Sequence, residues 1–379
     1  MSIQVSITNN SGIKSSEVYW ICFGLNGNPQ TSSPDWSYVD VDNKGNASLK
    51  KFTKGQDCAS LFKTVDELNS FKGLPEMWSG QFLFSFKKLP NVFNIVKGAQ
   101  NGLGVQTPPY TPGTADADTL FVVVEFTNIG SEIFADCTIV DYFSAPVSIE
   151  VIGKSDSKTN GIMKSTSTRD SIFNAIDALG KPWSNLIMKD SNGNNIRVLG
   201  PQHGVQTTNP NLLANTIYDS YVNACWKNFK TNTLTVHCPK FGTYTGKVNA
   251  NDEFVFSQTD KADVTIQKPG PGKAFDIFGC VGTLAAPNDT PLGEIAAILG
   301  AALNRTTLST KANDTQPNCD RSSFYQVVDG VTNEYAKAVV DNYESGIYAF
   351  PFADVCSKNN PLIDITNPTN FNITLSSWS

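Results

Sequence analysis

The period of the hydrophobic pattern changes partway along the chain, and this change limits the folds that the chain can adopt. In residues 1–153, short runs rich in β-branched and aromatic residues alternate with clusters of Gly, Pro and Asn, which is typical of strands joined by turns. The runs that predict strands are Val5–Thr8, Val18–Phe23, Phe82–Phe86, Leu120–Thr127 and Cys137–Phe143. The best helical candidate here, Cys58–Leu68, is short, so we expect an all-β sandwich or barrel.

From about residue 168, apolar residues recur at helical spacing instead. The predicted helices are 172–179, 213–229, 291–302, with Thr290 as N-cap and Pro291 at the first position, and 325–339. Strand-like runs between the second and third helices are Leu234–His237, Glu253–Ser257, Val264–Gln267 and Ala274–Phe278. A last strand, Phe371–Leu375, is expected to return to the first β-domain.

This order of elements predicts a mostly β chain with one domain inserted into another. We expect a β-domain made of residues 1–155, 232–286 and 345–379, and a mixed α/β domain made of residues 156–231 and 287–344. Because 40% of the 379 residues are hydrophobic, the chain can bury a sizeable core.

Charge and hydropathy exclude several classes of partner. The chain has 29 Lys and Arg against 35 Asp and Glu, so we expect no nucleic-acid partner, because no basic face can neutralise many phosphates. The longest apolar helical stretch, Ile295–Leu303, is far shorter than the roughly 20 residues of a membrane span. The N-terminal segment MSIQVSITNNSG lacks a charged start followed by an apolar core, so no signal peptide is expected in this chain.

The cysteines favour an extracellular protein. The chain has 8 cysteines, spread without a CxxC pair, which argues against a compact zinc site. An even, scattered count suits disulfides, although the sequence does not choose among the possible pairings. Several Asn-X-Ser/Thr sequons add weakly to the same interpretation, and we expect secretion.

Little in the sequence supports nucleophilic, metal or nucleotide chemistry. Only two histidines are present, His203 in a loop rich in Gly, Pro and Gln, and His237 in a strand pattern. A Ser/His/Asp triad or a multi-histidine metal site therefore has little to build from. Phosphate-binding glycine fingerprints are also absent. We expect no metal and no organic cofactor.

Two carboxyl groups stand in unusual surroundings. Glu125 lies inside the apolar run LFVVVEF, and Asp141 lies inside TIVDYF, where a charge costs free energy unless it is paired, hydrogen-bonded or in a cleft. A hairpin closed near residues 128–136 would bring the two acids close across the ladder. Glycosidic bond cleavage needs two such groups, one protonated and one ionised. The alternative is that each acid faces solvent or pairs with a Lys or Arg.

Nearly the whole chain resembles the family 64 glycoside hydrolases, which are β-1,3-glucanases that share a β-domain with thaumatin-like proteins. The matching segments are ITNNSG, VYWICFGLNG, SGQFLFSFKKLP, VVVEFTN, IVDYFSAPVSI, NIRVLGP, YDSYVNACWKNF, DIFGCVG, AALNRTTL, NEYAKAVVDN and IYAFPFADV. No single motif decides the matter, but their order and spacing are specific together.

The resemblance implies an activity and a catalytic pair. It implies an endo-acting, inverting hydrolase that cuts a linear β-1,3-glucan to short oligosaccharides, with Glu125 as general acid and Asp141 as general base. Inversion implies carboxyl groups roughly 6.5–9.5 Å apart. It also implies a thaumatin-like barrel or sandwich domain, an α/β domain and a wide groove between them for the glucan. We expect the protein to act as a monomer.

Other residues are candidates for binding sugar. Thr127 follows Glu125 by two residues on the same strand face, and an ordinary strand threonine is the alternative. Aromatic platforms of the right type are Trp36, Trp78, Trp183, Trp226 and Tyr110. Of these, Trp36 and Tyr110 lie in polar or Pro-rich loops and suit a groove wall, whereas Trp226 lies on the apolar stripe of a helix and suits the core.

The chain also departs from the family pattern. Phe352-Ala353-Asp354 stands where Tyr-Asp-Asp is expected, and NEYAKAVVDN lacks a histidine often found after that helix. Neither change removes the expected pair, although the missing acid bears on substrate length, affinity and activity. The second functional hypothesis is a thaumatin-like protein that binds β-glucan or a fungal surface without cutting it. Two carboxyls held well beyond about 10 Å apart, or one locked in a salt bridge away from any cleft, would favour that hypothesis.

Overall fold

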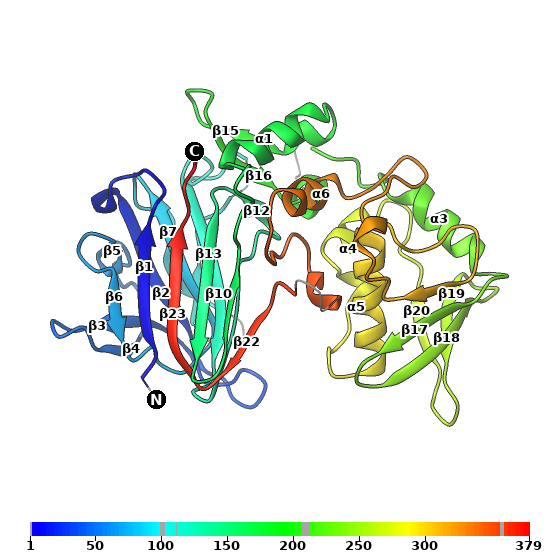
Figure 1. Cartoon of the computed structure of the whole chain (residues 1–379), viewed down its shortest axis with the longest axis horizontal. Helices are drawn as coiled ribbons and strands as arrows, with labels where there is room; N and C mark the ends of the chain where they lie inside the picture. Colours follow the sequence, from blue (N-terminus) through cyan, green and yellow to red (C-terminus); the bar gives the residue numbers. More distant parts are fainter. Residues whose placement is uncertain (1, 99–102, 111, 207–211, 357–359) are drawn as a thin grey trace.

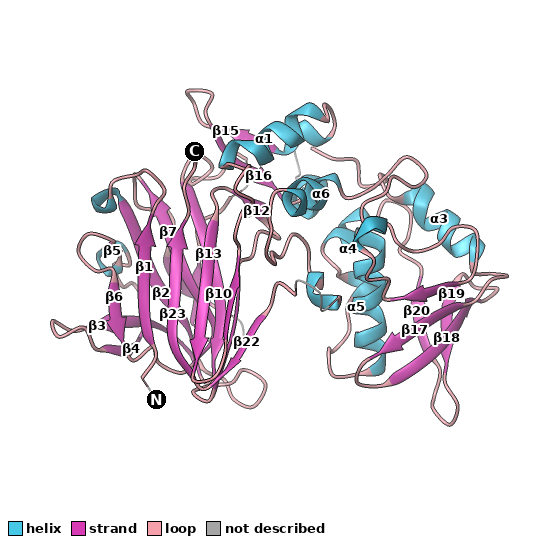
Figure 2. Cartoon of the chain, in the orientation of Figure 1, coloured by secondary structure: helices cyan, strands magenta, loops and turns pink. Residues whose placement is uncertain are grey.

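The computed structural model describes residues 2–98, 103–110, 112–206, 212–356 and 360–379. The described part is mostly β with some helices, and it forms two bodies that lie side by side (Figure 1). Strands dominate the body that holds both termini, whereas helices and a smaller sheet share the other (Figure 2).

The first body is a sandwich of two open sheets. One sheet has the strand order β14 (Ser157–Asn160), β13 (Val147–Gly153), β23 (Pro368–Leu375), β1 (Gln4–Asn9) and β6 (Ser70–Lys72). The other has the order β22 (Ile363–Thr366), β11 (Glu132–Asp136), β10 (Leu120–Asn128), β7 (Met77–Phe86), β2 (Val18–Asn26), β3 (Asp35–Val41) and β4 (Ala47–Lys51), with β5 (Lys63–Thr64) beside β2. Neither sheet closes on itself, so the sandwich form of the prediction holds and the barrel form does not.

Aromatic side chains join the inner faces of the two sheets. Trp20 of β2 stacks on Phe71 of β6, with ring centroids 5.9 Å apart. Phe82 of β7 and Phe126 of β10 each lie 5.8 Å from Phe371 of β23. The predicted return of the C-terminal strand is confirmed, since β23 pairs parallel with β1 and antiparallel with β13. The inner faces of the two sheets therefore pack against each other and form the core of the sandwich.

The second body packs helices on a five-stranded sheet. Its sheet has the order β20 (Val264–Gln267), β19 (Glu253–Ser257), β18 (Gly242–Val248), β17 (Leu234–Cys238) and β21 (Asp314–Gln316). Its helices are α3 (Asp219–Asn228), α4 (Ala274–Phe278) and α5 (Pro291–Asn304). Residues 234–267 were expected in the first β-domain, but their described strands pair only within this sheet, and β17 and β20 pack on α5.

Further elements lie outside these three sheets. They are β12 (Tyr142–Phe143), α1 (Arg169–Ala178), β15 (Ile187–Lys189), β16 (Asn195–Leu199), α2 (Pro201–Gln206), α6 (Glu334–Asp341) and the short turn of helix η7 (Ala353–Val355). Strands β12, β16 and β15 form a small sheet of their own. A separate hairpin joins β8 (Asn94–Lys97) to β9 (Leu103–Gln106).

The helix predictions have mixed outcomes. Helix α5 begins as predicted, with Thr290 Oγ1 accepting a hydrogen bond from the Gly293 amide at 3.0 Å. Helices α3 and α6 are shorter than predicted. Segment 274–278 is helix α4 rather than a strand, because its buried residues Ala274, Ile277 and Phe278 recur at helical spacing. The short candidate near residue 60 is a single 3₁₀ turn, Ala59–Leu61.

One disulfide, Cys319–Cys356, is present. The expectation of disulfide bonding is confirmed for this pair, whereas the other cysteines are buried free thiols, so disulfides do not account for most of the scattered cysteines. These thiols are Cys22, Cys58, Cys137, Cys225, Cys238 and Cys280. Within the described ranges, no helix is long and apolar enough to cross a membrane.

Candidate active site

Glu125 lies in the middle of β10 and points away from the sandwich core. Its neighbours Val124 and Phe126 are buried between the sheets, whereas Glu125 shares the opposite, half-buried face with Val123 and Thr127, as strand alternation predicts. This face of the larger sheet is called the outer face below. The ladder places Phe23, Gln81, Glu125 and Asp136 in one row across β2, β7, β10 and β11.

The surroundings of Glu125 favour its protonated form. Burial raises the pKa of its carboxyl group, and the negative charge of Asp141 raises the pKa further. The amide of Gln81 opposes this effect, because its Nε2 donates a hydrogen bond to Glu125 Oε1 at 3.0 Å. The net direction of the pKa is upward, as a general acid that works near neutral pH requires.

The predicted cross-strand pairing of Glu125 with Asp141 is wrong. The hairpin closes through a tight turn, in which the Ile129 amide donates to the Glu132 carbonyl and Gly130 has a φ of +83°. Residues 132–136, expected in the turn, therefore form β11, and Asp136 stands opposite Glu125. After Asp136 the chain leaves the sheet, and its backbone hydrogen bonds go to Tyr348 instead.

Asp141 lies on the irregular segment that follows, and neighbouring elements hold it in place. The Gly200 amide donates to the Asp141 carbonyl at 2.7 Å, and a Cβ at position 200 would collide with the Val140 carbonyl oxygen. Gln202 of α2 donates through Nε2 to the Val140 carbonyl at 2.9 Å. The side chain of Asp141 is 52% exposed, so the carboxylate is well solvated, in contrast to Glu125.

His203 of α2 contacts Asp141 directly. Its Nε2 lies 2.6 Å from Asp141 Oδ1 and 3.0 Å from the hydroxyl oxygen of Tyr110. The sequence predicts a loop and no role for His203, because a chain with only two histidines has little from which to build a triad or a metal site. The one signal that could have found it is its position just after NIRVLGP, a segment that carries the family resemblance.

Glu125 and Asp141 line the same pocket. The other lining residues are Gln81, Leu83, Thr107, Pro108, Tyr110, Phe121, Val123, Thr138 and Tyr142. A second pocket is lined by Ser79, Gly80, Gln81, Glu125, Phe126, Thr127, Phe134, Asp136 and Leu362. Because Gln81 and Glu125 line both, the two pockets meet at the proposed acid.

A buried arginine supports the aromatic wall of the first pocket. The guanidinium carbon of Arg197 lies 4.7 Å from the ring centre of Phe121 and 5.5 Å from that of Tyr142. Tyr142 in turn lies 5.0 Å from Tyr110, centre to centre. Arg197 packs on Tyr142, and Tyr142 packs on Tyr110. These contacts therefore fix the position of Tyr110, the tyrosine that contacts His203.

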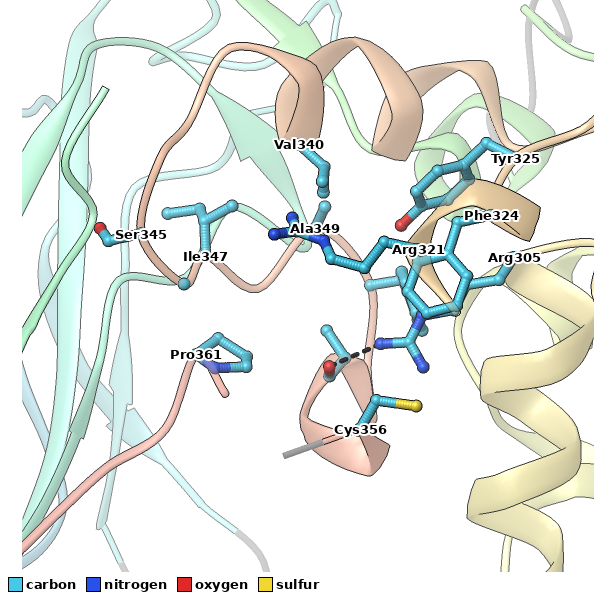
Figure 3. A pocket seen from close by; sticks show the side chains of 13 residues that line it. Arg305, Arg321, Phe324, Tyr325, Val340, Ser345, Ile347, Ala349, Cys356 and Pro361 are labelled. Atoms are coloured by element: carbon cyan, nitrogen blue, oxygen red, sulfur yellow. Dashed lines mark hydrogen bonds between the residues drawn. The ribbon is translucent and has the colours of Figure 1, made fainter. Parts of the chain in front are cut away.

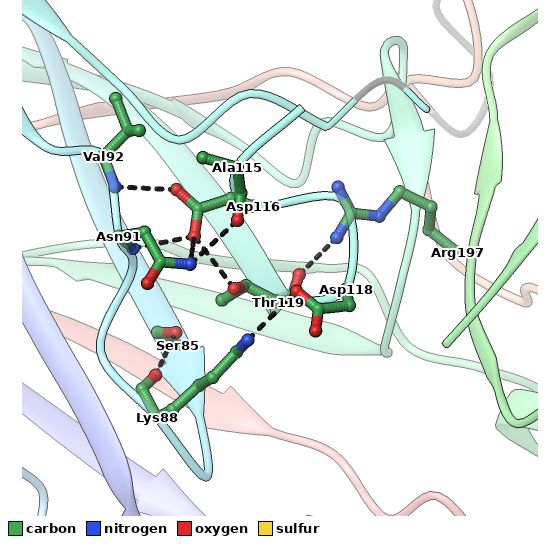
Figure 4. Close-up of polar contacts among 9 residues, drawn as sticks. All are labelled: Ser85, Lys88, Asn91, Val92, Ala115, Asp116, Asp118, Thr119 and Arg197. Atoms are coloured by element: carbon green, nitrogen blue, oxygen red, sulfur yellow. Dashed lines mark hydrogen bonds and ion pairs between the residues drawn. The ribbon is translucent and has the colours of Figure 1, made fainter. Parts of the chain in front are cut away.

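A network of hydrogen bonds fixes the loop near this wall (Figure 4). Arg197 donates to the Thr119 carbonyl. The fully buried carboxylate of Asp116 accepts from the amides of Asn91 and Val92 at 2.7 and 2.8 Å, and from the Thr119 hydroxyl. These contacts tie the end of β7 to the start of β10, the strand that carries Glu125.

The predicted sugar-binding residues lie on the outer face or at its wall. Thr127 lines the second pocket and Tyr110 the first. The ladder places Trp36 and Trp78 in one row, on either side of Leu25, and Trp36 packs on Phe23 at 6.2 Å. Their rings are half-buried, whereas Trp183 and Trp226 are core residues, as was expected for Trp226.

The segment with the unexpected alanine lies where the two bodies meet. Arg305, at the end of α5, donates through Nη2 to the Ala353 carbonyl at 2.7 Å, and its guanidinium carbon lies 4.7 Å from the Phe324 ring and 5.2 Å from the Phe350 ring. Figure 3 shows this contact beside a pocket that Arg321 also lines. Asp354, the acid that remains, follows Ala353 in η7.

The sequence and the fold both match known proteins. The chain matches the family 64 glycoside hydrolase model, described as β-1,3-glucanase, over residues 1–375. Glucan endo-1,3-β-glucosidases of Cellulosimicrobium cellulans and Arthrobacter sp. (strain YCWD3) are each 31% identical to it over 302 residues, which is 78% of this chain and 51% of theirs. The chain thus spans about half the length of these curated relatives.

Two solved structures share the whole fold. A laminaripentaose-producing β-1,3-glucanase in complex with laminaritetraose aligns with a TM-score of 0.81 at 26% identity, covering 100% of this chain and 99% of that one. A β-1,3-glucanase domain from Clostridium beijerinckii aligns with a TM-score of 0.82 at 20% identity, covering 100% and 98%. The resemblance found in the sequence is therefore confirmed: the chain belongs to the family 64 glycoside hydrolases, the β-1,3-glucanase family.

Proposed function

We propose that the protein is an endo-acting β-1,3-glucanase that hydrolyses its substrate with inversion at the anomeric carbon. The observation that carries the proposal is that Glu125 and Asp141 line one pocket in contrasting surroundings. Glu125 is recessed and its pKa is raised, whereas the side chain of Asp141 is 52% exposed. Two carboxyl groups that differ in this way suit the two roles of a single displacement.

In the proposed reaction Glu125 is the general acid and Asp141 the general base. Glu125 gives its proton to the glycosidic oxygen as the bond to the anomeric carbon breaks. Asp141 takes a proton from a water molecule whose oxygen attacks the same carbon from the opposite face. The new sugar end is an α-anomer, and both carboxyls regain their starting states by exchanging the proton with solvent. His203 holds the oxygen of Asp141 towards that water.

The substrate is a linear β-1,3-glucan of the laminarin or curdlan type. The names of the relatives support this proposal, since they include a β-1,3-glucanase solved with laminaritetraose. Thr127 would offer its hydroxyl to a sugar bound next to Glu125, and Tyr110 would form the opposite wall. Trp36, on the same outer face as Glu125, would stack on a more distant sugar ring.

The wider arrangement is part of the same proposal. We regard the sandwich as a thaumatin-like domain, the helical body as its insertion and the space beside the outer face as the glucan groove. The return of β23 to the first sheet supports the insertion. We further propose that the protein is secreted, because a polysaccharide of this kind is found outside the cell. We also propose that it acts as a monomer.

The test compares purified wild type with Glu125→Gln on laminarin, with Glu132→Gln as the matched control. Glu132 is an acid of the neighbouring strand that faces Asp364 rather than Glu125. We expect reducing ends from wild type and the control, and none from Glu125→Gln, while all three sediment with insoluble curdlan. Binding by all three without release by any would support the glucan-binding protein instead.

A further inference from the structure

A third carboxyl group, Asp136, faces the proposed general acid. It stands directly opposite Glu125 in the antiparallel ladder of β10 and β11, a position that places Cβ atoms about 4.5–5.5 Å apart. Both side chains line the pocket that also holds Thr127. The sequence predicts a turn at Asp136 and no role for it.

The groups around Asp136 are acidic or neutral. Glu125 faces it from β10, and Asp354 of η7 and Tyr348 approach from the loop that crosses the end of β11. On the far side, Glu132 and Asp364 share a hydrogen bond with each other, and the ammonium group of Lys158 bonds to the Leu362 carbonyl. Arg305 lies near Asp354 and donates to the Ala353 carbonyl. Among the described residues, no cation forms an ion pair with Glu125 or Asp136.

Two recessed carboxyl groups this close do not both ionise at neutral pH, because each negative charge raises the cost of the other. Burial raises the pKa of Asp136 well above its ordinary range, and the charges of Glu125 and Asp354 raise the pKa further. The carboxyl of Asp136 accepts no hydrogen bond from a described residue, whereas Glu125 accepts one from Gln81. The pair therefore holds one proton to higher pH than either carboxyl group would hold it alone.

We propose that Glu125 and Asp136 share one proton through the neutral pH range, and that the pair, rather than Glu125 alone, holds the proton that the proposed reaction uses. Asp136 is a positioning residue in this account, because it acts on the reaction only through Glu125. The role of Glu125 rests on the function proposed above, but the shared proton does not.

The first test is the pH profile of kcat/KM on laminarin. Asp136→Asn keeps the shape of the side chain and removes its charge, so Glu125 loses its proton more easily. We expect the alkaline limb of the profile to move to lower pH by about one unit, with the maximal rate reduced less than tenfold. Asp364→Asn, an acid opposite Phe134 on the same sheet edge, is the matched control and should leave the limb in place. An unmoved limb in Asp136→Asn would overturn the proposal.

The second test needs no activity. Infrared spectroscopy detects the carbonyl stretch of a protonated carboxyl group, and we expect one such band at pH 7 in the wild type. Its midpoint of loss should fall to lower pH in both Asp136→Asn and Glu125→Gln, because each variant removes one of the two interacting charges. Equal midpoints in all three proteins would overturn the shared proton. Shifted midpoints in a protein that leaves laminarin uncut would retain the carboxyl pair and refute the proposed function alone.

Discussion

The two proposed catalytic carboxyls lie on regions of opposite character. Glu125 lies inside a regular strand, with partner strands on both sides, and is fixed by backbone ladders and the amide of Gln81. Asp141 lies on an irregular segment and is fixed by side chains and backbone groups of residues 200–203. Solvent is largely excluded around Glu125 and has access to Asp141. Because their surroundings differ in this way, one carboxyl group is suited to give a proton and the other to take one.

Substitutions in the two regions should also affect the proposed reaction in different ways. A change near Glu125 acts on the charge balance of a rigid recess, so it should move the pH dependence. A change near Asp141 releases a side chain that few contacts hold, so it should act mainly by lowering the rate.

The largest expected effect separates the two acids by leaving group. On laminarin, Glu125→Gln and Asp141→Asn should each lower kcat by about 10²- to 10⁴-fold. On an aryl β-glucoside with an acidic phenol, which departs without a proton, Glu125→Gln should regain most of its loss and Asp141→Asn should not. Rates measured on both substrates check this, and equal recovery by both variants would contradict the assigned roles.

The next effect concerns His203. Its Nε2 lies 2.6 Å from Asp141, and His203→Asn leaves the carboxylate without this contact. We expect kcat to fall about 10- to 100-fold with little change in KM, because the proposed base is no longer aimed at the water. His237→Asn is the control, since His237 is exposed on β17 and bonds to Thr243. Steady-state kinetics of both variants decide the matter, and equal effects would remove His203 from the site.

A smaller effect is expected at Gln81. Its amide donates to Glu125 and stabilises the charged form, so Gln81→Met should raise the pKa of Glu125 further. A proposed acid with a higher pKa keeps its proton to higher pH, so the alkaline limb of kcat/KM should rise by about one unit. The sign is opposite to that expected for Asp136→Asn, and pH profiles measured side by side reveal it. A downward shift in Gln81→Met would show that the two neighbours do not act on Glu125 as described.

The smallest effects are expected from the sugar-binding candidates. Thr127→Val and Tyr110→Phe each remove one hydroxyl group and keep the shape of the pocket lining. Loss of one hydrogen bond costs about 0.5–1.5 kcal/mol, so KM for laminarin should rise about 2- to 12-fold. Trp78→Phe provides a comparison at an aromatic position farther along the outer face. An unchanged KM in both hydroxyl variants would remove them from the glucan site.

Local patterns in the sequence were enough to predict much of the fold. Alternation placed Glu125 on the half-buried face of its strand, and Thr290 with Pro291 marked the start of α5. The order of elements also predicted that the last strand returns to the first sheet. Each of these features depends on residues within one element or on the general character of a segment.

The rest depended on contacts between distant residues. A turn of three residues rather than nine changed the register, so Asp136 took the place expected for Asp141 opposite Glu125. The approach of His203 to Asp141 joins residues 62 positions apart, and no local signal predicts it. The number of cysteines likewise does not predict which of them form disulfides. Among the described residues, only Cys319 and Cys356 form one.

The most direct test of the account follows the anomeric form of the first products. Proton NMR is recorded during the first minutes of laminarin hydrolysis by the wild type, before the sugar ends mutarotate, with Glu125→Gln as the blank. A single displacement by Glu125 and Asp141 predicts that the new reducing ends are released as α-anomers and only later equilibrate. New ends released as β-anomers would contradict the account, because one of the two carboxyls would then have to attack the sugar itself.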